Sequence, residues 1–165
     1  MIKHRLAAIL LASTTAAALA ADVTPYYAGA DLGTSQFDGQ SDHLSSYGVL
    51  AGYQLNPYVG FELSLRRLGD VYVYTPTSVT KGNLNQSALS VIGTLPLNAR
   101  WGVLGRYGRV QLKQHGNNID PSMGNGALFG LGVQYTHTAA WAARLEAQRP
   151  ASGISNFSAS LLYTF

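Results

Sequence analysis

The chain has 165 residues, no cysteine and a formal net charge of +3, and only 12% of its residues are charged. One domain is the expectation for this length, and the lack of cysteine excludes disulfides and thiolate metal sites. Soluble domains carry about a quarter charged residues, so the composition indicates that something other than water covers much of the surface.

The chain begins with a segment that has the three parts of a secretory signal peptide. Lys3 and Arg5 give a basic head, an apolar stretch starts at Leu6, and small residues follow at Ala18 and Ala20. We therefore expect residues 1–20 to be removed on export, which leaves residues 21–165 as the mature domain. A membrane-anchoring helix is the alternative, but the apolar run is short and hydroxyl residues interrupt it.

Removal of this segment also changes the charge balance. The mature chain keeps nine Lys and Arg residues against eight Asp and Glu residues, so it is close to neutral. The sequence has no basic helix and no cluster of basic and aromatic residues. We therefore expect no nucleic-acid partner.

From Tyr26 onward the hydrophobic pattern repeats every two residues, which is typical of β-strands. Eight segments follow this pattern, each about as long as a tilted membrane strand. The segments are residues 26–35, 47–55, 58–68, 86–95, 101–113, 126–135, 141–149 and 155–165. Short connections at 56–57, 96–100 and 136–140 alternate with longer ones at 36–46, 69–85, 114–125 and 150–154. This alternation is typical of an up-and-down barrel in an outer membrane.

Alternate residues divide each predicted strand into an apolar face and a face of polar or small residues. The apolar face carries no charge within its runs, as in Val59, Phe61, Leu63 and Leu65. Two kinds of barrel have this pattern. A lipocalin-like barrel turns the apolar face inward around a ligand, whereas a membrane barrel turns it outward against lipid.

Aromatic residues favour the membrane barrel. If the amino terminus lies in the periplasm, seven aromatic residues of the apolar face fall at the end of the strands that carries the short turns. Such a girdle is typical of a membrane interface, because amphipathic rings favour the headgroup level. We therefore expect an all-β fold, an eight-stranded antiparallel up-and-down transmembrane β-barrel in the cell outer membrane. The girdle consists of Tyr26, Tyr53, Trp101, Tyr135, Trp141, Tyr163 and Phe165.

The polar face, which would line the lumen, carries equal numbers of acidic and basic residues within the strands. Because an unpaired buried charge is costly and a guanidinium group can bind two carboxylate oxygens, we expect these residues to pair and fill the lumen. A small ion gate is the alternative. A general diffusion pore is disfavoured, since eight strands enclose little more than their own side chains. The lumen charges are Asp31, Glu62, Arg66, Arg106, Arg144 and Glu146.

Four cations fall on the outward face at the end opposite to the short turns: Arg67, Arg109, Lys113 and Arg149. There they would meet the headgroups of the outer leaflet, whose phosphates are anionic. We hypothesise that they bind lipopolysaccharide through charge-assisted contacts. Ordinary snorkelling of long side chains at strand ends is the alternative.

The sequence gives little support for catalysis or metal binding. A lipid-modifying barrel enzyme would need Ser, His and a carboxylate gathered on one outer surface. His43 and His115 instead fall in predicted loops and His137 in a short turn, and no two histidines have the spacing of metal ligands. We therefore expect no catalytic site, no cofactor and no metal.

The second long connection contains alternating valine and tyrosine residues, from Val71 to Tyr74. This alternation predicts that the third strand continues above the membrane as part of a longer hairpin, which is the interpretation we favour. The alternative is that its exposed edge pairs with a partner strand.

Three parts of the sequence resemble the eight-stranded transmembrane domain of the OmpA family: YYAGADLG at 26–33, GYQLNPYVGFELS at 52–64, and FGLGVQY with ARLEAQ between 129 and 148. The most specific piece is NPYVGFE at 56–62, and the resemblance covers essentially the whole mature chain. Full-length members continue into a peptidoglycan-binding domain, which we do not expect here because the chain stops at the final strand.

The resemblance also implies roles for particular residues. The terminal Phe165 looks like the signature by which the barrel-assembly machinery recognises its clients. Glu62 and Arg144 match charged positions of the family interior, whereas Ile92 stands where a lysine is expected and Gln134 where a glutamate is expected. One charge of each sign is lost, so neutrality survives while a gate built on all four charges is in doubt.

Together these patterns predict a monomeric small outer-membrane barrel with a structural or surface-interaction role, in membrane integrity, adhesion or contact with lipid and lipopolysaccharide. A narrow, porin-like ion channel is the alternative, and a lipid A-modifying enzyme is less favoured.

Overall fold

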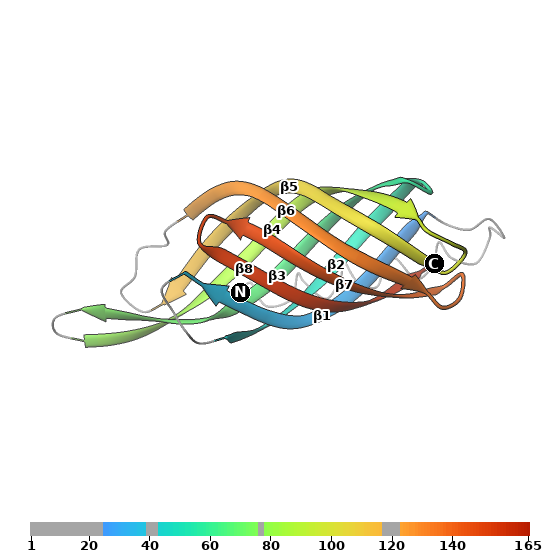
Figure 1. The fold of residues 1–165 in the computed structure, drawn as a ribbon. Helices are drawn as coiled ribbons and strands as arrows, with labels where there is room; N and C mark the ends of the chain where they lie inside the picture. The colour runs from blue at the N-terminus through green and yellow to red at the C-terminus, as the bar shows by residue number, and fades with distance from the viewer. Residues whose placement is uncertain (1–24, 39–42, 76–77, 117–122) are drawn as a thin grey trace, which may run out of the picture.

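The computed structural model describes residues 25–38, 43–75, 78–116 and 123–165, without the side chains of residues 70–81 and 114–123. The predicted signal peptide at residues 1–20 lies outside this part. The strands are β1 (Tyr26–Phe37), β2 (Leu44–Asn56), β3 (Val59–Thr75), β4 (Ser78–Pro96), β5 (Trp101–Gly116), β6 (Met123–Thr136), β7 (Trp141–Ala151) and β8 (Ile154–Thr164). They form a closed antiparallel barrel in sequence order (Figure 1), which confirms the predicted fold. No helix in the described residues is long and apolar enough to cross a membrane.

The barrel closes by pairing its first strand with its last. The β1–β8 ladder runs from the Tyr27–Thr164 pair to the Phe37–Ile154 pair. The backbone N–H of Phe165 also donates to the carbonyl of Tyr26 at 3.1 Å. Closure leaves no open edge along this seam, where unpaired backbone groups facing hydrocarbon would each cost several kcal/mol.

The three predicted short turns lie at one end of the barrel, called here the short-turn end, and a side chain caps each of them. Asn56 Oδ1 accepts the N–H groups of Tyr58 and Val59, both at 2.9 Å. Asn98 Oδ1 caps the second turn in the same way. In the third turn Thr138 Oγ1 accepts the N–H of Trp141 at 3.1 Å. Short polar side chains that bind nearby backbone groups are the usual reason for tight turns.

The opposite end, called the long-loop end, has longer strands than the pattern predicted. Most of the predicted connection 69–85 is strand, because β3 and β4 stay paired up to Thr75 and Ser78. The hairpin projects beyond the rest of the barrel (Figure 1), which confirms the longer hairpin. A register shift at Arg67 and Gly69 marks where it leaves the wall, and Gly69 has a φ of +144°, which glycine adopts readily.

The last predicted long connection, residues 150–154, is instead a tight turn between β7 and β8. Ala151 pairs with Ile154, and Gly153 has a φ of +80°. The carbonyl of Gly153 accepts the N–H of Asp38 at 2.8 Å, which fixes the turn against the end of β1. The prediction of a long loop was wrong because the strands extend into this segment: β7 ends at Ala151 and β8 begins at Ile154.

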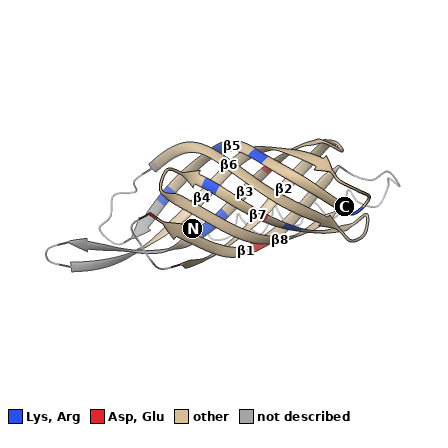
Figure 2. Cartoon of the chain, in the orientation of Figure 1, with Lys and Arg blue, Asp and Glu red and all other residues tan. Residues whose placement is uncertain are grey.

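Side chains alternate between lumen and exterior along every strand. On the outer face Leu32 and Leu131 are 72% and 71% exposed, whereas inward Leu104 and Leu128 are almost completely buried. Two small apolar clusters lie inside the barrel: Tyr27, Leu50 and Leu162 toward the short-turn end, and Ala88, Val110 and Leu128 toward the long-loop end. Lys, Arg, Asp and Glu are sparse along the ribbon as a whole (Figure 2).

Candidate functional site

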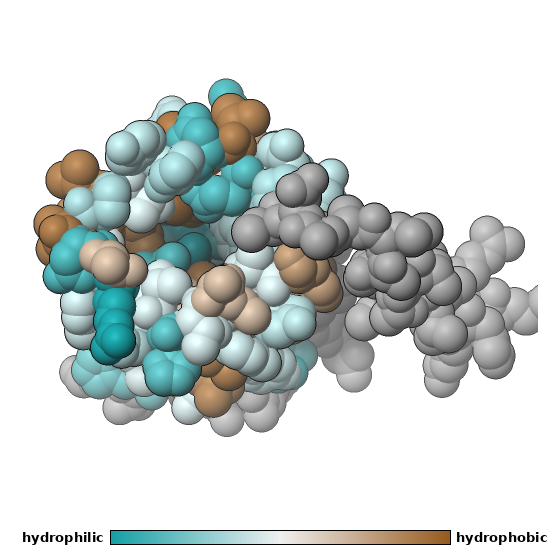
Figure 3. Space-filling view, turned by 90° about the vertical axis from the view of Figure 1, so that its right-hand side faces the viewer, coloured by the Kyte–Doolittle hydropathy of each residue, from teal (hydrophilic) through white to brown (hydrophobic). Residues whose placement is uncertain are grey.

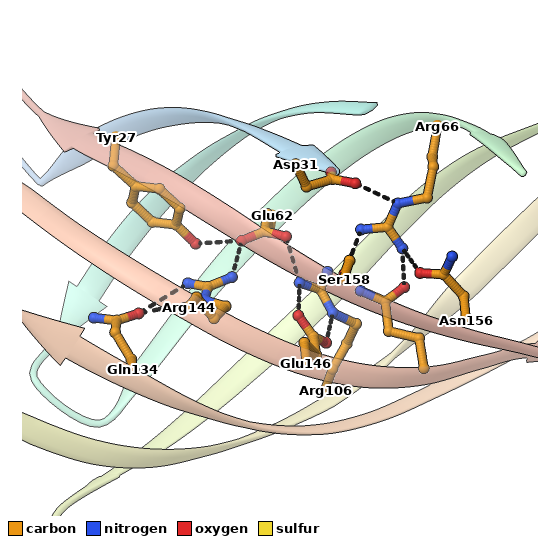
Figure 4. A network of polar contacts seen from close by, with 11 residues as sticks. Tyr27, Asp31, Glu62, Arg66, Arg106, Gln134, Arg144, Glu146, Asn156 and Ser158 are labelled. Carbon is orange, nitrogen blue, oxygen red and sulfur yellow. Dashed lines mark hydrogen bonds and ion pairs between the residues drawn. The ribbon is translucent and has the colours of Figure 1, made fainter. Parts of the chain in front are cut away.

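The six predicted lumen charges all lie inside the barrel, and each is at most 5% exposed. They project from four strands, because inward positions recur at every second residue of β1, β3, β5 and β7. The charges form two clusters along the barrel axis (Figure 4). We call them the Glu62 cluster, with Glu62, Arg106, Arg144 and Glu146, and the Arg66 cluster, with Asp31 and Arg66.

The Glu62 cluster is a chain of alternating charges that spans the lumen. Arg144 Nη1 donates to Glu62 Oε2 at 2.7 Å, and Arg106 Nη2 donates to Glu62 Oε1 at 2.5 Å. Arg106 also binds Glu146 with two N–H groups, at 2.5 and 2.9 Å. Two acids therefore balance two bases, which is what a buried ionic group requires to avoid an uncompensated charge.

Two uncharged side chains complete the Glu62 cluster. Tyr27 donates its hydroxyl to Glu62 Oε2 at 3.0 Å. Gln134 Oε1 accepts from Arg144 Nε at 3.3 Å and from Arg144 Nη2 at 3.2 Å. The Arg144 guanidinium also lies 5.9 Å from the centre of the Tyr27 ring. Glutamine thus still binds the arginine at the position where the family resemblance led us to expect a glutamate.

The Arg66 cluster contains one ion pair and several neutral acceptors. Arg66 Nε donates to Asp31 Oδ1 at 2.8 Å. Its Nη1 donates to Gln148 Oε1 and to Asn156 Oδ1, both at 2.8 Å, and Nη2 donates to Ser158 Oγ at 3.4 Å. The Asn156 amide in turn donates to hydroxyl groups on β1 and β2. One guanidinium therefore ties four strands together across the lumen.

The sequence analysis named the charged residues of these clusters but assigned no hydrogen-bonding role to their neutral partners. Gln148, Asn156 and Ser158 all occupy inward-facing positions of β7 and β8, within the predicted strand segments. The sequence signal that could have found all three is the alternation by which every second residue of a strand faces the lumen. Tyr27 has the same parity, but an aromatic residue on a polar face gave no reason to expect a hydrogen bond to a carboxylate.

Apolar side chains fill the lumen on either side of the clusters. Ile92 is 2% exposed and Leu104 1% exposed, so the position where a lysine was expected is packed instead. Nearer the long-loop end, Leu68 and Leu128 are completely buried. The described residues therefore close the lumen with side chains, as expected for a barrel of eight strands.

The four predicted outward cations lie at the long-loop end, beside three shallow grooves on the outer wall. Arg67 and Lys113 line one groove with Tyr47 and Leu65. Arg109 lines a second with Leu63 and Leu89, and Arg149 a third, which also holds Phe129, Phe157 and His43. Arg67 is half-buried and donates to Asn83 Oδ1 at 2.6 Å, so part of its hydrogen-bonding capacity is already used.

The predicted girdle residues lie on the outer face at the short-turn end, mostly as cross-strand pairs. Ring centres are 5.1 Å apart in the Tyr26–Tyr53 pair, 4.9 Å in the Trp101–Tyr135 pair and 5.0 Å in the Trp141–Tyr163 pair. Phe165 extends the last pair, with its ring 5.3 Å from Tyr163. Each pair joins directly opposed residues of neighbouring strands, so the girdle also reinforces the ladder.

The histidines do not approach one another or a set of acids in the described residues. His43 lies at the outer groove next to Arg149, and His137 contacts the Tyr135 ring at 6.4 Å. The side chain of His115 lies outside the described residues. No group of three His, Cys, Asp or Glu side chains in the described part could hold a metal ion.

Comparisons with solved structures agree on the architecture. Neisserial surface protein A is 16% identical, with a TM-score of 0.65, and the match covers 86% of this chain and 98% of that one. The amino-terminal barrel of Pseudomonas aeruginosa OprF is 19% identical, with a TM-score of 0.58 over 84% of this chain and 97% of that one. Ail of Yersinia pestis is 13% identical, with a TM-score of 0.55 over 85% and 96%. At these identities the shared property is the fold.

Sequence comparisons identify the family. The chain is 28% identical over 181 residues to outer membrane protein A of Serratia marcescens. The match covers 87% of this chain but 47% of that protein, so the chain spans about half the length of this relative. A model of the outer membrane protein beta-barrel domain matches residues 6–165. The chain therefore belongs to the outer membrane protein beta-barrel family, as an OmpA-like eight-stranded barrel of the outer membrane.

Proposed function

We propose that this protein has a structural and surface-interaction role in the outer membrane, and that it is neither an enzyme nor an open pore. The observation that carries the proposal is the division of the barrel into a packed, charge-balanced lumen and an apolar outer wall. The lumen charges are buried and paired. A packed interior stabilises the barrel, and the projecting β3–β4 hairpin is available for contact outside the membrane.

We propose further that the outward cations bind lipopolysaccharide. Each of the three outer grooves combines apolar lining residues with at least one cation, as with Leu65 next to Arg67 and Leu89 opposite Arg109 on the neighbouring strand. An acyl chain fits the apolar part, and a phosphate accepts charge-assisted hydrogen bonds from the cation. An apolar groove next to a cation supports a lipid site more than snorkelling alone, because snorkelling requires no groove.

Native mass spectrometry of the purified barrel tests the lipid proposal. The quadruple variant Arg67→Ala, Arg109→Ala, Lys113→Ala and Arg149→Ala should lose most of the lipopolysaccharide that the unchanged protein retains. The matched control exchanges the same residues between Lys and Arg, keeps all four charges and should retain the lipid. Equal retention by the quadruple alanine variant would show that these side chains only snorkel.

A narrow ion channel is the rival function, and conductance in planar bilayers separates it from the structural role. Because Ile92 and Leu104 pack beside the Glu62 cluster, we expect no stepwise conductance from the unchanged protein. Glu62→Ala removes the carboxylate that two guanidinium groups share, so it should reduce thermal stability and produce small conductance steps. Regular steps from the unchanged protein would favour the channel.

The final strand bears on both the assembly and the oligomeric state of the barrel. β8 pairs along its length with β1, so the barrel closes on itself and needs no second chain for closure. We propose a monomer whose final strand, ending at Phe165, is recognised by the barrel-assembly machinery. Deletion of Phe165 should reduce the folded, heat-modifiable fraction in cells but leave refolding of the purified chain into detergent nearly unchanged. Equal loss in both assays would assign Phe165 to stability alone.

A further inference from the structure

A cavity of about 430 Å³ opens at the short-turn end of the lumen. The end-on view shows this hollow at the centre of the ring of strands, with hydrophilic residues around it (Figure 3). Its size falls within the range of about 300–1,000 Å³ that is usual for small-molecule sites. The Glu62 cluster and the apolar residues beyond it close the inner end, so the cavity is a blind pocket reached from the short-turn side.

The wall of this pocket combines polar and apolar residues and is almost uncharged. Thr94, Gln134 and Thr164 contribute half-buried hydroxyl and amide groups. Among the described residues that line the pocket, Arg144 is the one charged side chain. Glu62 and Glu146, which balance the arginines, lie deeper in the lumen and do not line it. The charged group nearest the pocket is therefore the Arg144 guanidinium, which is paired with Glu62 on the side away from the pocket.

The floor also has hydrogen-bond donors to spare. Three of the five N–H groups of Arg144 donate to Glu62 and Gln134, so these bonds do not use its full donor capacity. The Gln134 carbonyl oxygen accepts from Arg144, so its amide nitrogen is left to donate, and this nitrogen points away from the network (Figure 4). A ligand at the floor would thus meet a cation and an amide donor.

We propose that this pocket binds a small monocarboxylate with a polar body, such as the carboxyl terminus of a short peptide. A planar guanidinium group matches the two oxygens of a carboxylate. A phosphate dianion would bring two charges to a floor that offers one cation. The hydroxyl and amide groups of the wall can hydrogen-bond to peptide groups, while Leu162 and Ala142 at the pocket lining can pack against a small side chain.

Two matched probes test the proposal on the barrel in lipid nanodiscs. N-acetyl-alanyl-alanine carries the carboxylate, and N-acetyl-alanyl-alaninamide has the same body without the charge. In nitrogen-15 NMR titrations, the acid should produce saturable shifts of the Gln134 side-chain amide and of the Thr94 and Thr164 backbone amides. The amide probe should bind at least tenfold more weakly. No saturable shift with the acid, or equal binding of both probes, would overturn the proposal without any variant.

Two isosteric substitutions then locate the site. Gln134→Glu keeps the acceptor for Arg144 but places a carboxylate in the pocket, so it should weaken binding of the acid at least tenfold. Gln148→Glu adds the same charge in the Arg66 cluster, at the other side of the lumen, and should change the affinity less than twofold. Heat-modifiable migration on a gel confirms that both variants fold. If both variants weakened binding of the acid equally, the effect would come from the total charge of the barrel, and the binding site would not be this pocket.

Discussion

The two halves of the lumen compensate their buried charges in different ways. In the short-turn half, Glu62 binds two guanidinium groups, and one of them, Arg106, binds a second acid. In the long-loop half, Arg66 has one acid and otherwise neutral acceptors. The first arrangement depends on every charge being present, whereas the second retains hydrogen bonds when its acid is removed. Similar burial therefore does not imply similar sensitivity to substitution.

The largest difference between the halves should come from removing the shared carboxylate. Glu62→Gln keeps the shape of the side chain but leaves Arg144 with no acid and removes one of the acids that face Arg106. Breaking a buried pair in this way costs about 3–5 kcal/mol, so the free energy of unfolding in lipid vesicles should fall by that amount in urea titrations. The double variant Glu62→Gln with Arg144→Gln restores the charge balance and should regain at least half of the loss. Unchanged stability in Glu62→Gln would abolish the distinction between the two clusters.

The matched change in the long-loop half should have a smaller effect. Asp31→Asn removes the acid of the Arg66 cluster, but Gln148 and Asn156 still accept from Arg66. A hydrogen bond to a charged group contributes about 1.5–3 kcal/mol, so we expect a loss of about 2 kcal/mol under the same conditions. A loss of unfolding free energy as large as that of Glu62→Gln would show that the neutral acceptors do not compensate for the lost carboxylate.

Most of the fold could be predicted because the two faces of each strand lie in different environments, lipid on the outside and the polar lumen on the inside. Phe61 and Leu63 face the exterior while Glu62 faces the lumen, and this alternation specifies both register and orientation. The side-chain caps at Asn56 and Asn98 likewise follow from local turn chemistry. The upper ends of β3 and β4 were harder to place, because a strand above the membrane and a loop in water have similar polar composition.

The candidate site was less predictable, because partners across the lumen are far apart in the sequence. Inward parity identifies Glu62, Arg106 and Arg144 individually, but contacts across the lumen depend on strand tilt and stagger. Glu62 and Arg144 are 82 residues apart in the sequence, and no local pattern predicts that they are in contact. The position of the blind pocket depends on which levels of the lumen are filled by side chains. The sequence pattern did not distinguish Leu68 and Leu128, which are buried nearer the long-loop end.

The third prediction tests whether Tyr27 belongs to the Glu62 cluster. A Cβ added at Gly52 would overlap the Tyr27 ring, so Gly52→Ala should displace that ring and weaken its hydrogen bond to Glu62. Overpacking of this kind typically costs about 1–3 kcal/mol, and we expect a loss of about 1 kcal/mol because the overlapping atoms lie at the far end of the Tyr27 side chain. Gly105→Ala is the control, because an added Cβ there meets no described atom within 4 Å. Equal stability of both variants would remove Tyr27 from the cluster.

The smallest expected effect extends the comparison of the two halves to the outer wall. Trp101→Leu removes one partner of the 4.9 Å pair with Tyr135 at the short-turn end, and Tyr107→Leu removes one partner of the 5.3 Å pair with Phe129 toward the other end. Aromatic pairs contribute about 0.5–1.5 kcal/mol beyond their burial, and a ring at the headgroup level gains further from its amphipathic character. Trp101→Leu should therefore lower the free energy of unfolding by about 1 kcal/mol and Tyr107→Leu by about half as much. The reverse order would mean that the short-turn aromatics act only as cross-strand pairs, and that the girdle has no separate role in holding this end of the barrel at the interface.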